Sequence, residues 1–524
     1  MTTIAIDFGT SNTVISLLEP DTQVAKTLQL PVSRLFRLTT QAGDGQEIPV
    51  VPTLAFVKQA GQLVFGEPVR SQRLGMAQPE RLFRAFKREL VADFQPPPRQ
   101  LDGISYSAEF ISEQFLKSLW HQILHQNIQP SNLVFTVPVA AFERYLAWFR
   151  ALGEQLTKTN VQIVDESTAA ALGYAIHHPG ALVLVVDFGG GTLDLSLVRT
   201  IVSTVKSVRD RAEVVAKSDA YVGGEDIDQW IVEDCLHHLG LSREAVGMIG
   251  WQNLLELAER LKIRLSGAET AKEIWLDDTT FMSYELVLSR DRLEAILEAH
   301  QVLEQLRQAL DEVLAIALGR GVHKSEIEHV LLVGGSCLIP AVQQLILSYF
   351  GRQRVQFDKP FEAVAHGALL VNQLAYVDDY LHHHYAIRLW EPHSRTYSYF
   401  PLFERGSQYP CKRAEPLILQ VATAGQTDIR LDIGEVAAMS QAEVIYDAQG
   451  RMSSAPLRHQ EIYRSLETHH DSVCLAHLDP PGQLGMDRIA VEFEVNAQRL
   501  LIATVRDLLT GKVLVERGEI AKLQ

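Results

Sequence analysis

Short apolar runs alternate with longer segments of helical periodicity from Thr3 to about Tyr376. The apolar runs, which we interpret as buried strands, comprise residues 4–6, 133–137, 182–186 and 330–333. Apolar residues recur at three- and four-residue spacing in the helical segments, which comprise residues 110–125, 141–156, 254–265 and 340–349. Buried strands that alternate with amphipathic helices predict a layered α/β architecture.

The pattern changes after Tyr376, where long helical periodicity gives way to short strands separated by turns. Apolar and polar residues alternate over residues 489–495 and 500–504, and residues 496–498 can form the turn between them, which predicts a β-hairpin. We therefore expect an α/β domain over residues 1–377, a linker over residues 378–386 and an all-β domain over residues 387–524.

A short motif occurs twice in the first domain. Asp7-Phe8-Gly9-Thr10 and Asp187-Phe188-Gly189-Gly190 each follow an apolar strand and precede another strand, which predicts two similar lobes. Glycine lets such a turn direct successive backbone N–H groups at phosphate oxygens. The aspartates would repel phosphate but can hold the water shell of Mg²⁺. One such motif alone is typical of a tight turn; two facing hairpins would grip a metal-complexed triphosphate.

Two further segments favour the phosphate-binding interpretation. Glu166 begins a predicted helix, where the helix dipole favours negative charge, and it could orient an attacking water molecule. Simple capping by Ser167 or Thr168 is the alternative. Gly334 and Gly335 connect a strand to a helix, which would let a nucleoside lie against the backbone, although tight strand–helix packing needs the same residues.

Six segments, taken in their order, carry a resemblance to a known family. They are residues 7–12 (DFGTSN), 136–138 (TVP), 165–172 (DESTAAAL), 187–194 (DFGGGTLD), 223–226 (GGED) and 333–340 (VGGSCLIP). This set resembles the seventy-kilodalton heat-shock protein (Hsp70, DnaK-like) chaperones, within the actin and sugar-kinase superfamily. The resemblance implies a two-lobed, actin-like (duplicated ribonuclease H-like) ATPase domain followed by a smaller all-β sandwich domain that binds peptides.

The resemblance also implies roles for the matched residues. Phosphate contacts are implied at Gly9, Thr10, Ser11, Asn12, Gly189, Gly190, Gly191 and Thr192. Organisation of Mg²⁺, K⁺ and the catalytic water is implied for Asp7, Glu166, Asp187 and Asp194, and catalytic roles extend to Thr192 and Arg70. The other implied positions for binding ATP or ADP are Gly223, Gly224, Glu225, Glu259, Lys262, Ser266, Gly334, Gly335 and Ser336.

Two departures from the family pattern modify these expectations. Arg70 follows the segment Gly66-Glu67-Pro68-Val69 and would replace the family's lysine beside the γ-phosphate, although a guanidinium is not equivalent to an ammonium. The family's adenine-stacking arginines fall at Ile263 and Leu338, where apolar contact would replace cation–π stacking. We therefore expect slow or altered hydrolysis and weaker affinity for ATP.

Composition excludes several other classes of protein. A chain of 524 residues that is 47% hydrophobic and 21% charged is globular and large enough for several packing units. A net charge of −16 disfavours binding to nucleic acid or to anionic membranes. We find neither a leader pattern nor a transmembrane run, and expect a soluble cytoplasmic protein. The four cysteines have no metal or disulfide spacing.

These observations predict an ATP-dependent chaperone for unfolded or extended polypeptides, active in the stress response. The resemblance implies J-domain co-chaperones and a nucleotide-exchange factor as partners. The alternative is a nucleotide-gated binding or scaffold protein with little or no ATP turnover. A small-molecule kinase of the same superfamily would have no need of the β domain. The sequence ends at Gln524 directly after the β pattern, so we expect no helical lid and rapid peptide exchange.

Overall fold

The computed structural model divides into two compact units. Unit 1 comprises Met1–Val377 and Ala442–Leu457, and unit 2 comprises Asp378–Gln441 and Arg458–Gln524. The structure describes residues 2–19, 22, 24–38, 46–59, 61–91, 96–138, 143–175, 181–201, 211–370, 376–377, 381, 384–391, 396–404, 407, 409–441, 444–446, 452–454, 458–466, 473–496 and 500–523. Most of the expected linker and part of the expected turn at residues 496–498 lie outside these residues, so both stay predictions.

The first half of unit 1 is built on a mixed sheet in the order β12-β11-β1-β2-β5-β4, with β3 paired to β2. Its strands are β1 (Thr3–Phe8), β2 (Asn12–Leu18), β3 (Ala25–Thr27), β4 (Arg34–Leu38), β5 (Gln46–Pro52), β11 (Asn132–Val137) and β12 (Asn160–Asp165). β1 runs antiparallel to β2 and parallel to β11, which is parallel to β12. Helices α3 (Ala108–His125) and α4 (Glu143–Leu156) share an apolar cluster with this sheet. We call residues 2–175 the first lobe.

A smaller sheet, β7-β6-β8, and a β9–β10 hairpin extend the first lobe. Their strands are β6 (Leu54–Gln59), β7 (Gln62–Phe65), β8 (Leu82–Arg84), β9 (Arg99–Leu101) and β10 (Ile104–Tyr106). The helices of this part are α1 (Glu67–Ser71), η1 (Pro79–Arg81) and α2 (Phe86–Val91). The buried rings of Phe83, Phe86 and Phe115 join these elements to α3. They therefore share one core with the large sheet.

A second sheet repeats the arrangement of the first, in the order β19-β18-β13-β14-β15-β20. Its strands are β13 (Leu182–Phe188), β14 (Leu193–Ile201), β15 (Arg211–Ala220), β18 (His329–Val333), β19 (Val355–Gln356) and β20 (Tyr376–Val377). β13 runs antiparallel to β14 and parallel to β18, which is parallel to β19. These directions match those around β1, so the predicted duplication and the two-lobed α/β architecture are confirmed. We call residues 181–360 the second lobe.

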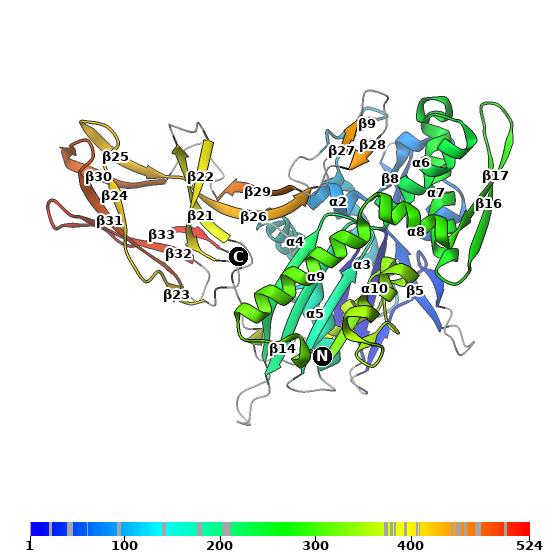
Figure 1. The fold of residues 1–524 in the computed structure, drawn as a ribbon, viewed down its shortest axis with the longest axis horizontal. Helices are drawn as coiled ribbons and strands as arrows, with labels where there is room; N and C mark the ends of the chain where they lie inside the picture. Colours follow the sequence, from blue (N-terminus) through cyan, green and yellow to red (C-terminus); the bar gives the residue numbers. More distant parts are fainter. Residues whose placement is uncertain are drawn as a thin grey trace. The chain divides into compact units, whose positions relative to one another are not determined.

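Helices and a hairpin complete the second lobe. They are α6 (Gly224–Leu239), α7 (Arg243–Leu265), β16 (Thr270–Leu276), β17 (Ser283–Ser289), α8 (Arg290–Ala299), α9 (Val302–Gly319), η2 (Lys324–Glu326), η3 (Gly335–Leu338) and α10 (Pro340–Phe350). α9 lies along β14 and β15 (Figure 1). Pro340 occupies the first helical position, where its missing N–H costs no hydrogen bond, so the predicted start of α10 is confirmed.

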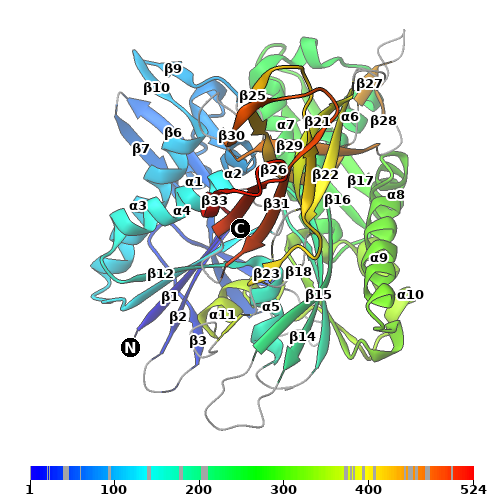
Figure 2. The same ribbon diagram turned by 90° about the vertical axis from the view of Figure 1, so that its left-hand side faces the viewer.

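Two helices, α5 (Glu166–Ala175) and α11 (Ala363–Leu370), lie in the apolar layer between the two sheets (Figure 2). They approach so closely that a Cβ built on Gly367 would stand 1.7 Å from the carbonyl oxygen of Ala169. Only glycine leaves room for this backbone contact. The run of small residues after Glu166 therefore allows the helix crossing that joins the lobes.

Unit 2 consists of strands throughout its described elements. One sheet has the order β22-β21-β26-β29, a second joins β23 and β24 to β31-β32-β33, and β25 pairs with β30. The strands are β21 (His384–Glu391), β22 (Thr396–Phe403), β23 (Cys411–Lys412), β24 (Leu417–Gln420), β25 (Gln426–Leu431), β26 (Ile433–Gln441), β29 (Arg458–Ser465), β30 (Val473–Gly482), β31 (Asp487–Val495), β32 (Leu500–Asp507) and β33 (Val513–Lys522). The β31–β32 pairing confirms the predicted hairpin strands.

A buried ion pair lies within unit 2. Arg488 and Asp507 are each 1% exposed, and their side chains meet at 2.9 Å. A short pairing of β27 (Val444–Tyr446) with β28 (Met452–Ser454) belongs to unit 1, whereas the sequence placed these residues in the β domain. No described helix is both long enough and apolar enough to cross a membrane.

Candidate functional site

The two repeated turns lie directly against each other in unit 1. A Cβ built on Gly190 would stand 2.1 Å from the hydroxyl oxygen of Ser11, and one on Gly191 would stand 2.7 Å from that of Thr10. Each turn connects two antiparallel strands: the first joins β1 to β2, and the second joins β13 to β14. The structure therefore brings together the two glycine turns that the sequence motif predicted to face each other.

The second turn is held by the segment that starts α6. The N–H groups of Gly224 and Glu225 donate to the carbonyl oxygens of Gly189 and Gly190 at 3.0 and 2.9 Å. A Cβ on Gly223 would stand 2.3 Å from the carbonyl oxygen of Gly190. The role of these residues in this structure is thus to support the turn, and their predicted contacts with a nucleotide stay a prediction.

Acidic side chains gather at the ends of the central strands. Asp7 and Asp187 are the residues before the last in β1 and β13. Asp194 pairs with Asp187 in the strand register, and Glu166 is the first residue of α5. The hydroxyl of Thr136 on β11 donates to Asp7 Oδ1 at 2.8 Å. Glu166, Asp187 and Asp194 are 7%, 8% and 2% exposed, so little water reaches their carboxylates.

Crowding of these carboxylates away from water raises their pKa values. Loss of water, followed by the charge of Glu166, raises the pKa of Asp7 to about 7. Loss of water, followed by the charges of Asp219 and Glu166, raises the pKa of Asp194 to about 7. The pKa of Asp187 is also raised well above its ordinary value, first by burial and then by the charge of Glu166. Burial and the neighbouring carboxylates therefore disfavour the ionised form of each of these groups.

A lysine that the sequence analysis missed provides positive charge in this cluster. Lys87 lies on α2, is 5% exposed, and places its ammonium 2.8 Å from Glu166 Oε1. Burial alone would lower the pKa of Lys87, but the charge of Glu166, followed by that of Asp7, raises it above its ordinary value. A cation therefore stands beside the carboxylate that was predicted to orient the attacking water.

The structure places Arg70 against Glu259, and its predicted catalytic role stays a prediction. Its guanidinium donates to both carboxylate oxygens of Glu259 on α7, at 3.1 and 2.9 Å, and among the described residues it forms no ion pair with Asp7, Glu166, Asp187 or Asp194. Lys87 takes the place that we had given to Arg70, so the chain does possess a lysine beside Glu166. Arg70 follows a recognisable glycine and proline in the sequence, whereas Lys87 follows Phe86 in a short helix without a distinctive motif.

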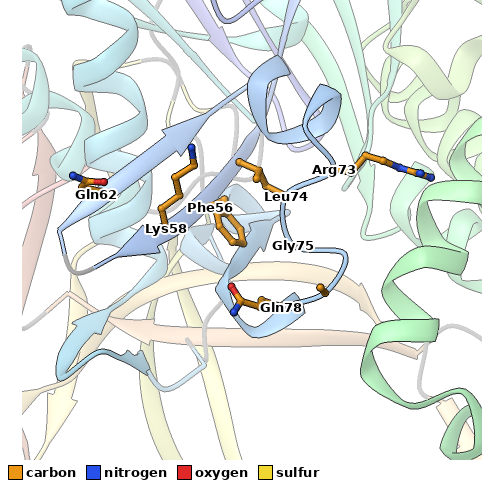
Figure 3. A pocket seen from close by; sticks show the side chains of 8 residues that line it. Phe56, Lys58, Gln62, Arg73, Leu74, Gly75 and Gln78 are labelled. Atoms are coloured by element: carbon orange, nitrogen blue, oxygen red, sulfur yellow. The ribbon is translucent and has the colours of Figure 1, made fainter. Parts of the chain in front are cut away.

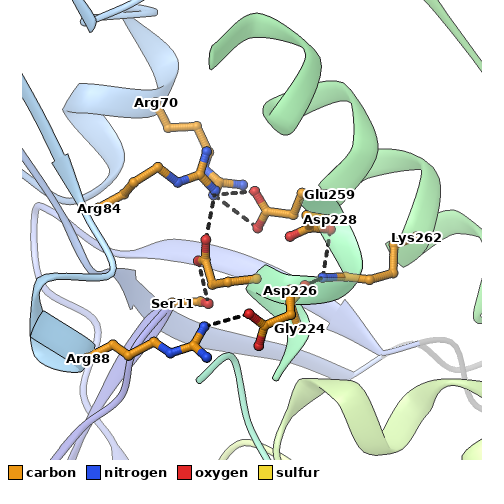
Figure 4. A network of polar contacts seen from close by, with 10 residues as sticks. Ser11, Arg70, Arg84, Arg88, Gly224, Asp226, Asp228, Glu259 and Lys262 are labelled. Carbon is orange, nitrogen blue, oxygen red and sulfur yellow. Dashed lines mark hydrogen bonds and ion pairs between the residues drawn. The ribbon is translucent and has the colours of Figure 1, made fainter. Parts of the chain in front are cut away.

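Arg70 is one of three arginines of the first lobe that reach acidic residues of the second (Figure 4). Arg88 on α2 meets Asp226 at 2.8 Å, and Arg84 on β8 meets Glu225 at 3.4 Å. Glu225 also accepts a hydrogen bond from the hydroxyl of Ser11 at 3.0 Å. Partly buried ion pairs thus connect the lobes on the side of the glycine turns.

The positions predicted for adenosine contacts have partners within the protein. The Lys262 ammonium lies 2.7 Å from Asp228 and 2.6 Å from the carbonyl oxygen of Gly224. The Ser336 hydroxyl donates to the carbonyl oxygen of Gly189 at 2.8 Å, and Ser266 ends α7.

The backbone at these positions explains two other features of the sequence. Gly334 has φ +84°, and a Cβ there would stand 2.4 Å from the carbonyl oxygen of Phe188, so glycine is needed for packing on β13. The alternative interpretation of this segment as tight strand–helix packing is therefore supported by the geometry. At α5 the cap is Asp165, whose Oδ1 accepts from Thr168 N at 2.8 Å, and not Ser167 or Thr168.

A groove elsewhere in the first lobe contains none of these residues. Its volume is about 480 Å³, and it is lined by Phe56, Lys58, Gln62, Arg73, Leu74, Gly75, Ala77 and Gln78 (Figure 3). The buried carboxylates are thus separate from this groove.

The residues of the cluster fit a hydrated divalent cation with phosphates. Buried carboxylates that raise one another's pKa are stabilised by added positive charge, and glycine turns without Cβ atoms leave backbone close to an entering anion. Within the described residues, however, no group of three His, Cys, Asp or Glu side chains could hold a metal ion directly. Mg²⁺ commonly keeps several of its own water molecules, and the roles of Asp7, Glu166, Asp187 and Asp194 around such an ion stay predictions.

A comparison with protein-family models decides the family. The model described as Hsp70 protein matches residues 101–377, which is more than half of the chain. The chain belongs to the Hsp70 family. The resemblance found in the sequence is thus confirmed, and with it the actin-like, two-lobed class of the fold.

Curated relatives of this Hsp70 chain match nearly its whole length. Chaperone protein DnaK of Thermosipho melanesiensis is 25% identical over 541 residues, which cover 97% of this chain and 78% of that protein. Chaperone protein DnaK of Thermosipho africanus is 25% identical over 538 residues, with the same shares covered. The DnaK of Thermotoga petrophila is 24% identical over 541 residues, covering 97% and 79%. The match therefore extends beyond unit 1 into unit 2.

Proposed function

We propose that this Hsp70-family protein is a molecular chaperone that binds and hydrolyses ATP to control its hold on unfolded or extended polypeptides. The observation that carries the proposal is the buried cluster of Asp7, Glu166, Asp187 and Asp194, with Lys87 2.8 Å from Glu166, beside two facing glycine turns. Phosphoryl transfer depends mainly on positioning and on neutralisation of charge, and this cluster offers groups for both.

The side chains of the cluster would divide these tasks. Lys87 would donate to an oxygen of the terminal phosphate. Glu166, released from part of its ion pair with Lys87, would accept from the attacking water and orient it. The three aspartates would accept from the water shell of Mg²⁺, and the bound ion would offset charge on the phosphate oxygens. K⁺ would occupy the same acidic region.

Unit 2 would bind the polypeptide. Its strands form several sheets, and extended peptides bind such domains through backbone hydrogen bonds and side-chain pockets. J-domain co-chaperones and a nucleotide-exchange factor are partners that we propose on the basis of family membership alone.

Calorimetric titration with ATP, ADP and GTP, each with and without Mg²⁺, tests the nucleotide site. We expect Mg²⁺-dependent binding of ATP and ADP, with weakened preference for adenine because Ile263 and Leu338 offer no cation to stack on the base. Absence of nucleotide binding by the wild-type protein would overturn the proposal. Stimulation of ATP turnover by an unfolded polypeptide then tests the coupling to unit 2.

The second candidate is a nucleotide-gated binding or scaffold protein with little turnover. Ile263 and Leu338 still favour it, but Arg70 no longer does, because Lys87 occupies the position beside Glu166. A single-turnover assay of bound ATP separates the two candidates. Release of the γ-phosphate by the wild type, but not by Glu166→Ala or Asp7→Ala, would support the ATPase. Persistence of intact ATP on the wild type would favour the scaffold.

A further inference from the structure

Tyr145 carries a buried hydroxyl near the carboxylate cluster and belongs to none of the motif segments. Tyr145 lies on α4, is 4% exposed, and packs edge-on against Phe149 with 4.9 Å between ring centroids. Its hydroxyl is fully enclosed and has no hydrogen-bond partner among the residues that the structure describes. The ring belongs to the apolar core of the first lobe, but the hydroxyl gains nothing from that core.

The surroundings of this hydroxyl are charged. The side chains of Lys87, Glu166 and Asp7 all act on it electrostatically. A tyrosine hydroxyl keeps its proton near neutral pH, so Tyr145 can donate a hydrogen bond. The hydroxyl therefore stands as an unused donor near the place where phosphate would enter.

A second buried tyrosine of the same core shows the contrast. Tyr106 is 1% exposed, and its hydroxyl oxygen accepts a hydrogen bond from the N–H of Gly61 at 3.2 Å. Phenylalanine at position 106 would lose that bond. Phenylalanine at position 145 would lose no bond within the described protein and would remove an unsatisfied buried group, which is itself destabilising.

We infer that the Tyr145 hydroxyl donates a hydrogen bond to an anionic phosphate oxygen of the nucleotide bound beside Lys87 and Glu166. The inference rests on the proposed function and adds a phosphate-binding residue from α4 to those of the two glycine turns. The enclosed hydroxyl, the lack of an acceptor among the described residues and the ammonium of Lys87 all agree with an acceptor that arrives with the ligand. Such a bond, from a neutral donor to a charged acceptor, is stronger than one between neutral groups.

The experiment compares Tyr145→Phe with the wild type and with Tyr106→Phe as the matched control. Calorimetry measures the affinity for Mg·ATP, and thermal unfolding measures stability without ligand. For Tyr145→Phe we expect an affinity for Mg·ATP about tenfold lower or more, the loss typical of one hydrogen bond to a charged group. We expect its midpoint without ligand to be no lower than that of the wild type. For Tyr106→Phe we expect the reverse, with a lower midpoint and an affinity within about twofold of the wild type.

The two hypotheses can fail separately. If the wild type binds Mg·ATP and Tyr145→Phe binds it within about twofold as tightly, this inference is wrong and the proposed function stands. A lowered midpoint of Tyr145→Phe with unchanged affinity would assign the hydroxyl a purely structural partner and also overturn the inference. If the wild type binds no nucleotide, both fall.

Discussion

At the scale of single residues, the buried pair of Lys87 and Glu166 shows how the site depends on charge compensation. The two groups are 2.8 Å apart, and both side chains are less than 10% exposed. A buried charge without its partner is strongly destabilising, because neither water nor a counter-ion replaces the lost interaction. The pair therefore contributes to folding as well as to the proposed chemistry.

We predict that Lys87→Met lowers the free energy of unfolding by about 3 kcal/mol, because it leaves the carboxylates of Glu166 and Asp7 without their cation. Adding Glu166→Gln to that variant should cost less than the sum of the two single changes, with a coupling of about 1 to 3 kcal/mol. Denaturant unfolding of the four proteins measures this cycle.

The control for this cycle is Lys26→Met, which removes an exposed lysine 3.9 Å from Glu19. An exposed pair contributes little, so we expect a change below about 0.5 kcal/mol. Additive effects of Lys87→Met and Glu166→Gln would show that the two side chains do not form the pair described above.

At the scale of elements, the contact between the second glycine turn and the start of α6 determines the geometry of the site. Gly223 has an extended backbone that any residue could adopt, with φ −151°, so its importance comes from close approach alone. A Cβ there would meet the carbonyl group and the next nitrogen of the turn at 2.3 to 2.5 Å. The turn would have to move away from α6 to make room.

We predict that Gly223→Ala weakens nucleotide binding at least about tenfold and destabilises unit 1, because backbone cannot yield as a flexible side chain does. Gly319→Ala at the end of α9 is the control, since no atom lies within 4 Å of a Cβ built there. Calorimetry and thermal unfolding of both variants test this. Equal behaviour of the two variants would contradict the packing described for the turn.

At the scale of the whole molecule, the two units have separate apolar cores. The cores of unit 1 and of unit 2 share no residue among those described. Arg488 and Asp507 form their buried ion pair on β31 and β32, whose apolar residues belong to the unit 2 core. Proteins with several cores commonly depart from two-state unfolding. Ligands stabilise only the part that binds them.

We predict two unfolding transitions in calorimetry. Mg·ADP should raise the midpoint temperature of the transition that belongs to unit 1 and leave the other midpoint unchanged. Arg488→Met should lower the midpoint temperature of the unit 2 transition, with a loss of about 3 kcal/mol in the free energy of unfolding, because it leaves Asp507 buried without its partner. A single transition that responds both to Mg·ADP and to Arg488→Met would show that the units unfold together.

Local patterns in the sequence predicted the elements of this protein and the duplication of its glycine turns. Apolar runs identified β1, β11, β13 and β18, helical spacing identified α3, α7 and α10, and the repeated motif identified the facing turns. These features depend on residues that are close together in the sequence, so a short stretch of the chain is enough to recognise them.

Only the tertiary structure decided which side chains meet at the site. Arg70 pairs with Glu259, 189 residues away, and Lys87 pairs with Glu166, 79 residues away. The Tyr145 hydroxyl likewise owes its surroundings to charges from β1, α2 and α5. Contacts at such separations follow from how the lobes pack, and a charged side chain in the sequence carries no mark of the partner that packing will bring to it.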